Sequence, residues 1–163
     1  MIFPVFENMD IIEGLRKKYD PLYGLVQPHI TLVFPFESEL SQADIGAAIE
    51  SALAQFSTFS IELNGLAQLE RWMFFNVTKG EDMIAKIHEA LYAESFSQFK
   101  PSWLKQYTPH LTVGQFGSAH EAQKAYEMEK HQTETFACTV EKISVEIIGE
   151  KDESIIEVER RLK

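Results

Sequence analysis

The 163 residues are enough for one domain with a substantial core, because a chain of this length buries roughly 70% of its unfolded surface. The formal charge of −10 disfavours a protein that coats duplex nucleic acid, since such binding depends on neutralising phosphates with Lys and Arg. The single Cys138 excludes an internal disulfide, and no apolar run approaches the ~20 residues that span a bilayer. We therefore expect a cytoplasmic protein with no membrane segment, and the composition indicates no particular protein partner.

The first half of the chain is predicted, in order, as strand, helix, strand, helix and two strands. Strands are indicated by β-branched and aromatic runs, and helices by apolar residues at helical spacing. Ser41 and Asp44 are spaced as in a capping box, which favours a helix start there. The predicted elements are a strand at Met1–Phe6, a helix at about residues 9–19, a strand at Gln27–Phe34, a helix from Ser41 to Phe56, and strands at Phe59–Leu66 and Arg71–Thr78.

The second half repeats this order from its own first helix onward. Its elements are a helix from Thr78 to about Phe99, a strand at Tyr107–Phe116, a helix from Ser118 to about Lys130, and strands at Phe136–Ile148 and Ile155–Val158. When the sequence is shifted by 81 residues, the predicted helices and strands of the first half align with those of the second half. We therefore predict an α+β fold in which residues 1–163 form a single bilobal domain. It would be a duplicated α-β-α-β-β unit with pseudo-twofold symmetry, repeats at roughly 1–81 and 82–163, and a central cleft between two antiparallel-rich sheets.

One short motif occurs twice at this spacing, as Pro-His-Ile-Thr at residues 28–31 and as Pro-His-Leu-Thr at residues 109–112. An aliphatic residue follows each copy, Leu32 in the first and Val113 in the second. Side chains two apart on a strand share a face, so the histidine and threonine of each copy point the same way while the aliphatic residues face the core. Pseudo-twofold symmetry would bring the two histidines to equivalent positions in one cleft.

Two histidines with two hydroxyl neighbours suit the hydrolysis of a phosphodiester. Near neutral pH one imidazole can take a proton from water while the other protonates the leaving oxygen. The hydroxyls of Thr31 and Thr112 can donate hydrogen bonds to the non-bridging phosphate oxygens. This scheme requires no metal and no cofactor. A zinc site on His29 and His110 is less favoured, because zinc takes three or four protein ligands and threonine is not a common one.

The sequences His-Ile-Thr-Leu at 29–32 and His-Leu-Thr-Val at 110–113 resemble the paired motifs of the two-histidine (2H) phosphoesterase superfamily. This superfamily includes 2′-5′ RNA ligase-like proteins and 2′,3′-cyclic nucleotide phosphodiesterases. The resemblance covers the whole chain, because family members are bilobal with one motif in each lobe. It implies that the histidines are the catalytic acid and base and that the threonines hold the phosphate. By analogy with the cyclic phosphodiesterases, His110 would be the base and His29 the acid.

The resulting prediction is a metal-independent phosphoesterase that hydrolyses a 2′,3′-cyclic phosphate or a related small phosphodiester. The acidity of the chain favours a small substrate or a short RNA end over long RNA. Two alternatives stay open, a non-catalytic binder of a phosphorylated ligand or RNA end and a 2′-5′ RNA end ligase. Phe36, Tyr107 and Phe116 flank the motifs and could stack on a substrate base, although packing within the protein is their simpler role.

Overall fold

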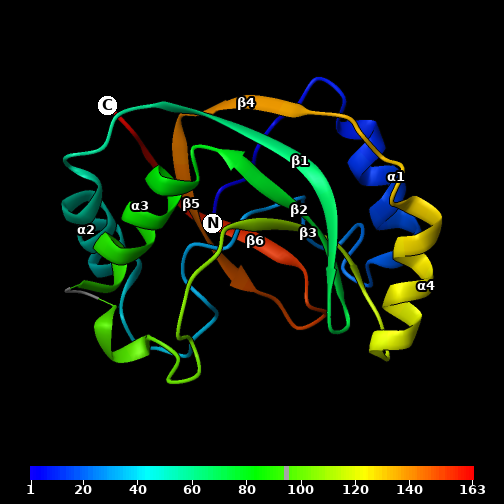
Figure 1. Ribbon diagram of the computed structural model, residues 1–163. Coiled ribbons are helices and arrows are strands. Elements are labelled where there is room, and N and C mark those ends of the chain that lie inside the picture. Colours follow the sequence, from blue (N-terminus) through cyan, green and yellow to red (C-terminus); the bar gives the residue numbers. More distant parts are fainter. Residues whose placement is uncertain (94–95) are drawn as a thin grey trace.

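The computed structural model describes residues 1–93 and 96–163 and contains two antiparallel sheets with helices on either side. Within these residues no helix combines the length and apolar character that crossing a bilayer requires. Figure 1 shows two helices together at each side of the molecule with the strands between them. One pair is α1 (Met9–Tyr19) with α4 (Ala119–Glu129), and the other is α2 (Gln42–Leu53) with α3 (Glu81–Ala93).

The larger sheet has four strands in the order β3-β2-β1-β4, all antiparallel. Strands β1 and β2 come from the first half of the chain, and β3 and β4 come from the second. Their bounds are Phe59–Leu69 for β1, Trp72–Lys79 for β2, His110–Gln115 for β3 and Phe136–Val140 for β4. The second histidine motif therefore lies at the start of β3, an outer strand of this sheet, with Pro109 just before the strand.

The smaller sheet pairs β5 (Lys142–Ile148) with β6 (Ser154–Arg161). Met1 extends it, because the Ser144 amide donates to the Met1 carbonyl at 3.0 Å. Next to Met1, Ile2 forms an antiparallel bridge with Ile30 in the first motif, and Ile30 forms a second bridge with Leu111 on β3. The first motif thus lies between the two sheets and connects them.

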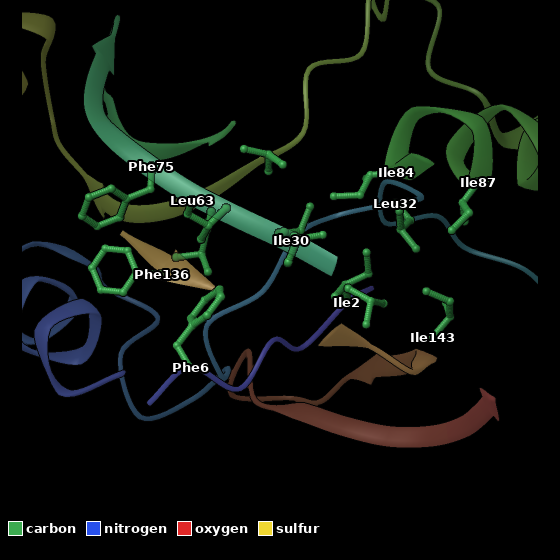
Figure 2. Packing of buried hydrophobic residues seen from close by; sticks show 14 of the residues in the cluster. Ile2, Phe6, Ile30, Leu32, Leu63, Phe75, Ile84, Ile87, Phe136 and Ile143 are labelled. Carbon is green, nitrogen blue, oxygen red and sulfur yellow. The ribbon is translucent and has the colours of Figure 1, made fainter. Parts of the chain in front are cut away.

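The core surrounds this junction. Figure 2 shows Ile30 close to Ile2 and Leu63, with Leu32 continuing toward Ile84 of α3. All five side chains are essentially inaccessible to solvent. Burying an isoleucine or leucine contributes about 1.5–3 kcal/mol relative to leaving it exposed. The apolar face of the first motif is therefore anchored in the core by Ile30 and Leu32.

The predicted α+β class and the order of the helices are confirmed, but two predicted strands are wrong. Met1–Phe6 and Gln27–Phe34 each contribute a single bridged residue instead of a strand. Pro4 and Pro28 account for this, since proline has no N–H to donate to a ladder and interrupts pairing on either side of the bridge. The first motif is consequently extended without being part of a continuous sheet.

Other predicted ends lie within three residues of the observed ones, and two further differences are larger. The helix expected to reach about Phe99 ends at Ala93, and a 3₁₀ turn covers Ser97–Phe99, while residues 94–95 of that prediction lie outside the described ones. The strand expected at Phe136–Ile148 is divided at Glu141, because its first part pairs with β1 and its second with β6. The division of one domain into repeats at residues 1–81 and 82–163 stays a prediction.

The start of α2 allows a direct test of capping. The Ser41 hydroxyl accepts from the Asp44 amide at 3.2 Å, and the Ser41 amide donates to the Asp44 carboxylate at 3.3 Å, which completes a capping box. Ser41→Ala should lower the free energy of unfolding by about 1 kcal/mol, as measured by urea denaturation. Ser51→Ala is the matched control, because Ser51 is exposed inside the same helix. Equal effects of the two changes would contradict the role of the cap.

Candidate active site

The antiparallel bridge between Ile30 and Leu111 sets how the two motifs face each other. In antiparallel register, the residue before Ile30 lies opposite the residue after Leu111. His29 is therefore opposite Thr112, and Thr31 is opposite His110. In such a pairing the Cβ atoms of directly opposed residues are about 5 Å apart, and those of diagonal neighbours are about 7–8 Å apart. His29 and His110 are diagonal neighbours, so their Cβ atoms are expected to lie at roughly the longer of these separations.

Burial alternates along both motifs as the sequence pattern predicts. In the first motif Ile30 is buried while His29 and Thr31 are half-buried, and in the second Leu111 is buried while His110 and Thr112 are half-buried. Because alternate side chains of an extended segment point to opposite faces, the two histidines and two threonines share the face away from the core. We call these four side chains the paired-motif patch.

Each histidine makes the same local hydrogen bond. The Nδ1 atom of His29 lies 2.8 Å from the Gln27 carbonyl, and the Nδ1 atom of His110 lies 2.8 Å from the Thr108 carbonyl. A carbonyl oxygen only accepts, so Nδ1 carries the hydrogen and Nε2 of each neutral ring has a free lone pair. The proline between each histidine and its acceptor limits the backbone conformation without competing for that carbonyl. Both imidazoles therefore present the nitrogen that can accept or deliver a catalytic proton.

An aromatic ring lies beside each imidazole. The Phe3 ring is 6.1 Å from that of His29 in an edge-on arrangement, and the Phe74 ring is 4.8 Å from that of His110. Phe74 comes from β2, where it pairs with Thr112, while Phe3 follows the bridged Ile2. These contacts restrict the rotation of the imidazoles and remove part of their surface from water.

The electrostatic surroundings of His29 are mixed. Burial lowers the pKa of His29, and this effect outweighs the hydrogen bond to Gln27 and the carboxylate of Glu146, which both raise that pKa. The guanidinium of Arg16 and the amino group of Met1 lower the pKa further. The neutral form of His29 is thus favoured in the absence of substrate, and an anionic phosphate would shift the balance toward the imidazolium.

Arg16 also shapes the approach to the first motif, a role that the sequence did not indicate. It is buried in α1, where Nε donates to the Asp20 carboxylate at 2.7 Å. A terminal nitrogen of its guanidinium donates to the Val26 carbonyl at 2.7 Å and to the Leu22 carbonyl at 3.3 Å. A buried charge with its hydrogen bonds satisfied in this way holds the loop that leads into the motif. Arg16 is therefore a structural residue.

The three aromatic residues that were candidates for substrate stacking all contact other parts of the protein. Phe36 stacks on Phe99 with ring centres 4.1 Å apart, and Phe116 lies 5.7 Å from Tyr19. Tyr107 stacks on His88, and its hydroxyl donates to the Thr31 carbonyl at 2.6 Å. The structure thus brings Tyr107 against the backbone of the first motif at Thr31. Stacking of any of the three aromatic residues on a substrate stays a prediction.

A cavity of about 850 Å³ opens where the first motif ends. Phe34 and Phe36 line one side, and Ser144 and Glu146 of β5 line another. Within β5, Ser144 is buried and Glu146 is half-buried. The alternation of side chains along a strand does not indicate a neighbouring cavity. The sequence around Ser144 and Glu146 therefore gave no sign that these residues line one.

The described residues contain no group of three or more His, Cys, Asp or Glu side chains that could hold a metal ion. The paired-motif patch itself offers two imidazoles and two hydroxyls. The two imidazoles can transfer protons without a metal ion. The prediction of metal-independent chemistry therefore depends on the two histidines.

Comparisons with known proteins identify the family and the fold. The family profile described as the 2′-5′ RNA ligase superfamily matches residues 4–152. A Bacillus cereus (strain ATCC 14579) protein named "Putative phosphoesterase" is 32% identical over 119 residues, which are 71% of this chain and 67% of that protein. The structure of TT0787 from Thermus thermophilus is 17% identical with a TM-score of 0.65, covering 99% of this chain and 94% of that one. Escherichia coli LigT, solved in complex with ATP, is 16% identical with a TM-score of 0.53, covering 93% and 91%.

Proposed function

This chain belongs to the 2′-5′ RNA ligase superfamily of two-histidine phosphoesterases, and we propose that it hydrolyses a 2′,3′-cyclic phosphate or a related small phosphodiester without a metal ion. The register at Ile30 and Leu111 carries this proposal, because it sets each histidine opposite the threonine of the other motif. A phosphate held over the paired-motif patch would meet two proton-transfer groups and two neutral donors.

In the proposed mechanism a water molecule attacks phosphorus while Nε2 of His110 takes its proton. The new P–O bond forms as the ester P–O bond opposite it breaks, and Nε2 of protonated His29 delivers a proton to the leaving oxygen. Thr31 and Thr112 donate to the non-bridging oxygens as their charge redistributes. The product is a phosphomonoester, with His110 protonated and His29 neutral. Proton exchange with solvent restores the starting state.

The charge of the chain supports a small substrate. At −10 the protein repels a long polyanion, whereas a single phosphate needs only local donors. LigT was solved with ATP bound, so a nucleotide is a suitable probe of binding at the corresponding position in this chain. Nucleoside 2′,3′-cyclic phosphates are therefore the first substrates to test.

The test is turnover of the four nucleoside 2′,3′-cyclic phosphates and of 2′-5′-linked dinucleotides in the presence of EDTA. Activity that survives EDTA and disappears in the His29→Ala/His110→Ala double variant supports the proposal. If the purified protein binds these nucleotides but its turnover does not exceed that of the double variant, the site is a binding module and the catalytic proposal is wrong.

RNA end ligation is the second candidate, because the matching family is described as 2′-5′ RNA ligases. It uses the same two proton-transfer groups with a ribose hydroxyl in place of water: the base deprotonates this hydroxyl, its oxygen bonds to the phosphorus of the 2′,3′-cyclic phosphate, and the acid protonates the 3′ oxygen as its bond to phosphorus breaks. Joined products from oligonucleotides with cyclic phosphate ends would identify this activity. Hydrolysis without joined products would favour the phosphodiesterase.

The lowered pKa of His29 predicts the pH dependence. At low pH both imidazoles are protonated and neither can act as the base, so activity rises as pH increases through the lower of the two pKa values. Burial lowers the pKa of His29 below its ordinary value of 6.5, so the acidic limb of kcat/KM should lie below pH 6.5. This limb has the same position whichever histidine is the acid.

Glu146→Gln should move the acidic limb further toward low pH, because it removes a carboxylate that raises the pKa of His29. Glu150→Gln is the control, since Glu150 is exposed at the β5–β6 turn. The measurement is kcat/KM against pH for the three proteins. An acidic limb that does not move in Glu146→Gln would exclude His29 as its source.

A further inference from the structure

The two motifs are held in different ways. The second is part of the β2–β3 ladder, in which His110 pairs with Asn76 and Thr112 pairs with Phe74. The first has backbone hydrogen bonds at Ile30, whose amide and carbonyl both pair with Ile2 at 2.9 Å. Beyond Ile30, side chains from outside the motif bind its backbone groups.

Three side chains make these bonds. The Tyr107 hydroxyl donates to the Thr31 carbonyl at 2.6 Å, and Nδ1 of His88 donates to the Leu32 carbonyl at 2.6 Å. One step further, the Phe34 amide donates to the Tyr92 hydroxyl at 3.0 Å. These bonds take the place of a neighbouring strand along the segment that follows Ile30.

The three side chains form one packed cluster. The rings of His88 and Tyr107 are nearly parallel with centres 3.8 Å apart, and Tyr92 meets His88 edge-on at 5.0 Å. His88 and Tyr92 are four residues apart on α3 and so lie on the same face of the helix. His88 and Tyr92 therefore tie the backbone at Leu32 and Phe34 to a single helix.

His88 has a feature that packing alone does not explain. It is fully buried, yet its Nε2 has no hydrogen-bond partner among the described residues, and burial lowers its pKa so that the ring stays neutral. The Glu89 carboxylate lies 3.8 Å from this nitrogen, which is beyond hydrogen-bonding distance. A buried polar atom without a partner is destabilising, and an apolar residue of similar size would avoid that cost. The bond from Nδ1 to the first motif is the interaction that an apolar residue could not make.

Tyr107 links the two motifs directly. It lies three residues before His110, in the segment that leads into β3, and its hydroxyl binds the backbone of Thr31, which is opposite His110 in the register. We propose that Tyr107, supported by His88, is a positioning residue that fixes Thr31 and His29 relative to the second motif. This inference rests on the proposed phosphodiester chemistry and assigns Tyr107 a role other than substrate stacking.

The test is Tyr107→Phe, which keeps the ring on His88 and removes only the hydroxyl. Misplacing catalytic groups by a fraction of an ångström impairs the chemical step more than binding, so kcat should fall by about tenfold or more with little change in KM. Tyr19→Phe is the matched control, since it removes a hydroxyl that donates to Glu129 at 2.9 Å and joins α1 to α4. Its kcat should be unchanged.

The His88 variants test the same inference by rescue. His88→Leu removes the donor to the Leu32 carbonyl, whereas His88→Asn keeps an amide donor close to the position of Nδ1. Asparagine should therefore retain more of kcat than leucine at equal occupancy of the folded state, as measured by urea denaturation. Unchanged kcat in Tyr107→Phe, or equal losses in both His88 variants, would overturn the positioning role.

An NMR readout separates this inference from the proposed function. In Tyr107→Phe, the amide signals of Thr31 and Leu32 and the ring signals of His29 should shift, while those of Tyr19→Phe should match the wild type at these residues. If these shifts occur in a protein without any turnover, the proposed function fails and the positioning role stands. Absence of the shifts overturns the positioning role whatever the activity.

Discussion

Replacing either histidine of the paired-motif patch with alanine is expected to lower turnover of a 2′,3′-cyclic phosphate by ~10²–10⁴-fold. His29→Ala removes the group proposed to protonate the leaving oxygen, and His110→Ala removes the group proposed to deprotonate water. The free Nε2 atoms, set by the Nδ1 bonds to Gln27 and Thr108, are the physical basis of this expectation. Steady-state kcat/KM with EDTA present is the measurement.

The double variant makes this prediction sharper. If the histidines act together in one step, removing the second should cost much less than removing the first, because groups that work as a unit are strongly non-additive. His120→Ala and His131→Ala are matched controls, since both side chains are exposed and lie outside the motifs. Turnover that persists in either single variant at the level of these controls would contradict the proposed acid–base pair.

Removing a threonine hydroxyl should have the second largest effect. Thr31→Val and Thr112→Val keep the shape of the side chain but delete a donor to developing negative charge, at a cost of about 3 kcal/mol or ~10²-fold in kcat for each. Each threonine lies opposite the histidine of the other motif, so both losses should be of similar size. Rates for the two variants and for wild type on the same cyclic phosphate measure this effect.

Serine and a distant threonine provide the comparisons. Thr31→Ser and Thr112→Ser keep the hydroxyl and should recover most of the activity that valine loses. Thr139→Val is the control for the substitution itself, because Thr139 is exposed on β4. Equal activity of the serine and valine variants would show that the hydroxyls do not bind the phosphate.

Several features of the fold could be predicted because they are properties of single segments. Helix α2 begins after Ser41 as its capping pattern indicates, and the buried and half-buried residues of both motifs alternate as expected. The prediction of a strand at Gln27–Phe34 was wrong because a strand depends on a second segment and is not a property of one segment alone. A ladder requires a partner with matching backbone groups, and the partner of this segment is largely a set of side chains from α3 and Tyr107.

The amino-acid sequence by itself determined the chemistry of the candidate site, since its repeated His-X-Thr pattern places an imidazole and a hydroxyl on the polar face of each motif. Only the tertiary structure decided that His29 lies opposite Thr112, that Glu146 and Arg16 act on the pKa of His29, and that Tyr107 holds Thr31. The physical reason is that periodicity reports which way side chains point along one segment. The register between segments 81 residues apart depends on how Ile2, Ile30 and Leu111 pack together in the core.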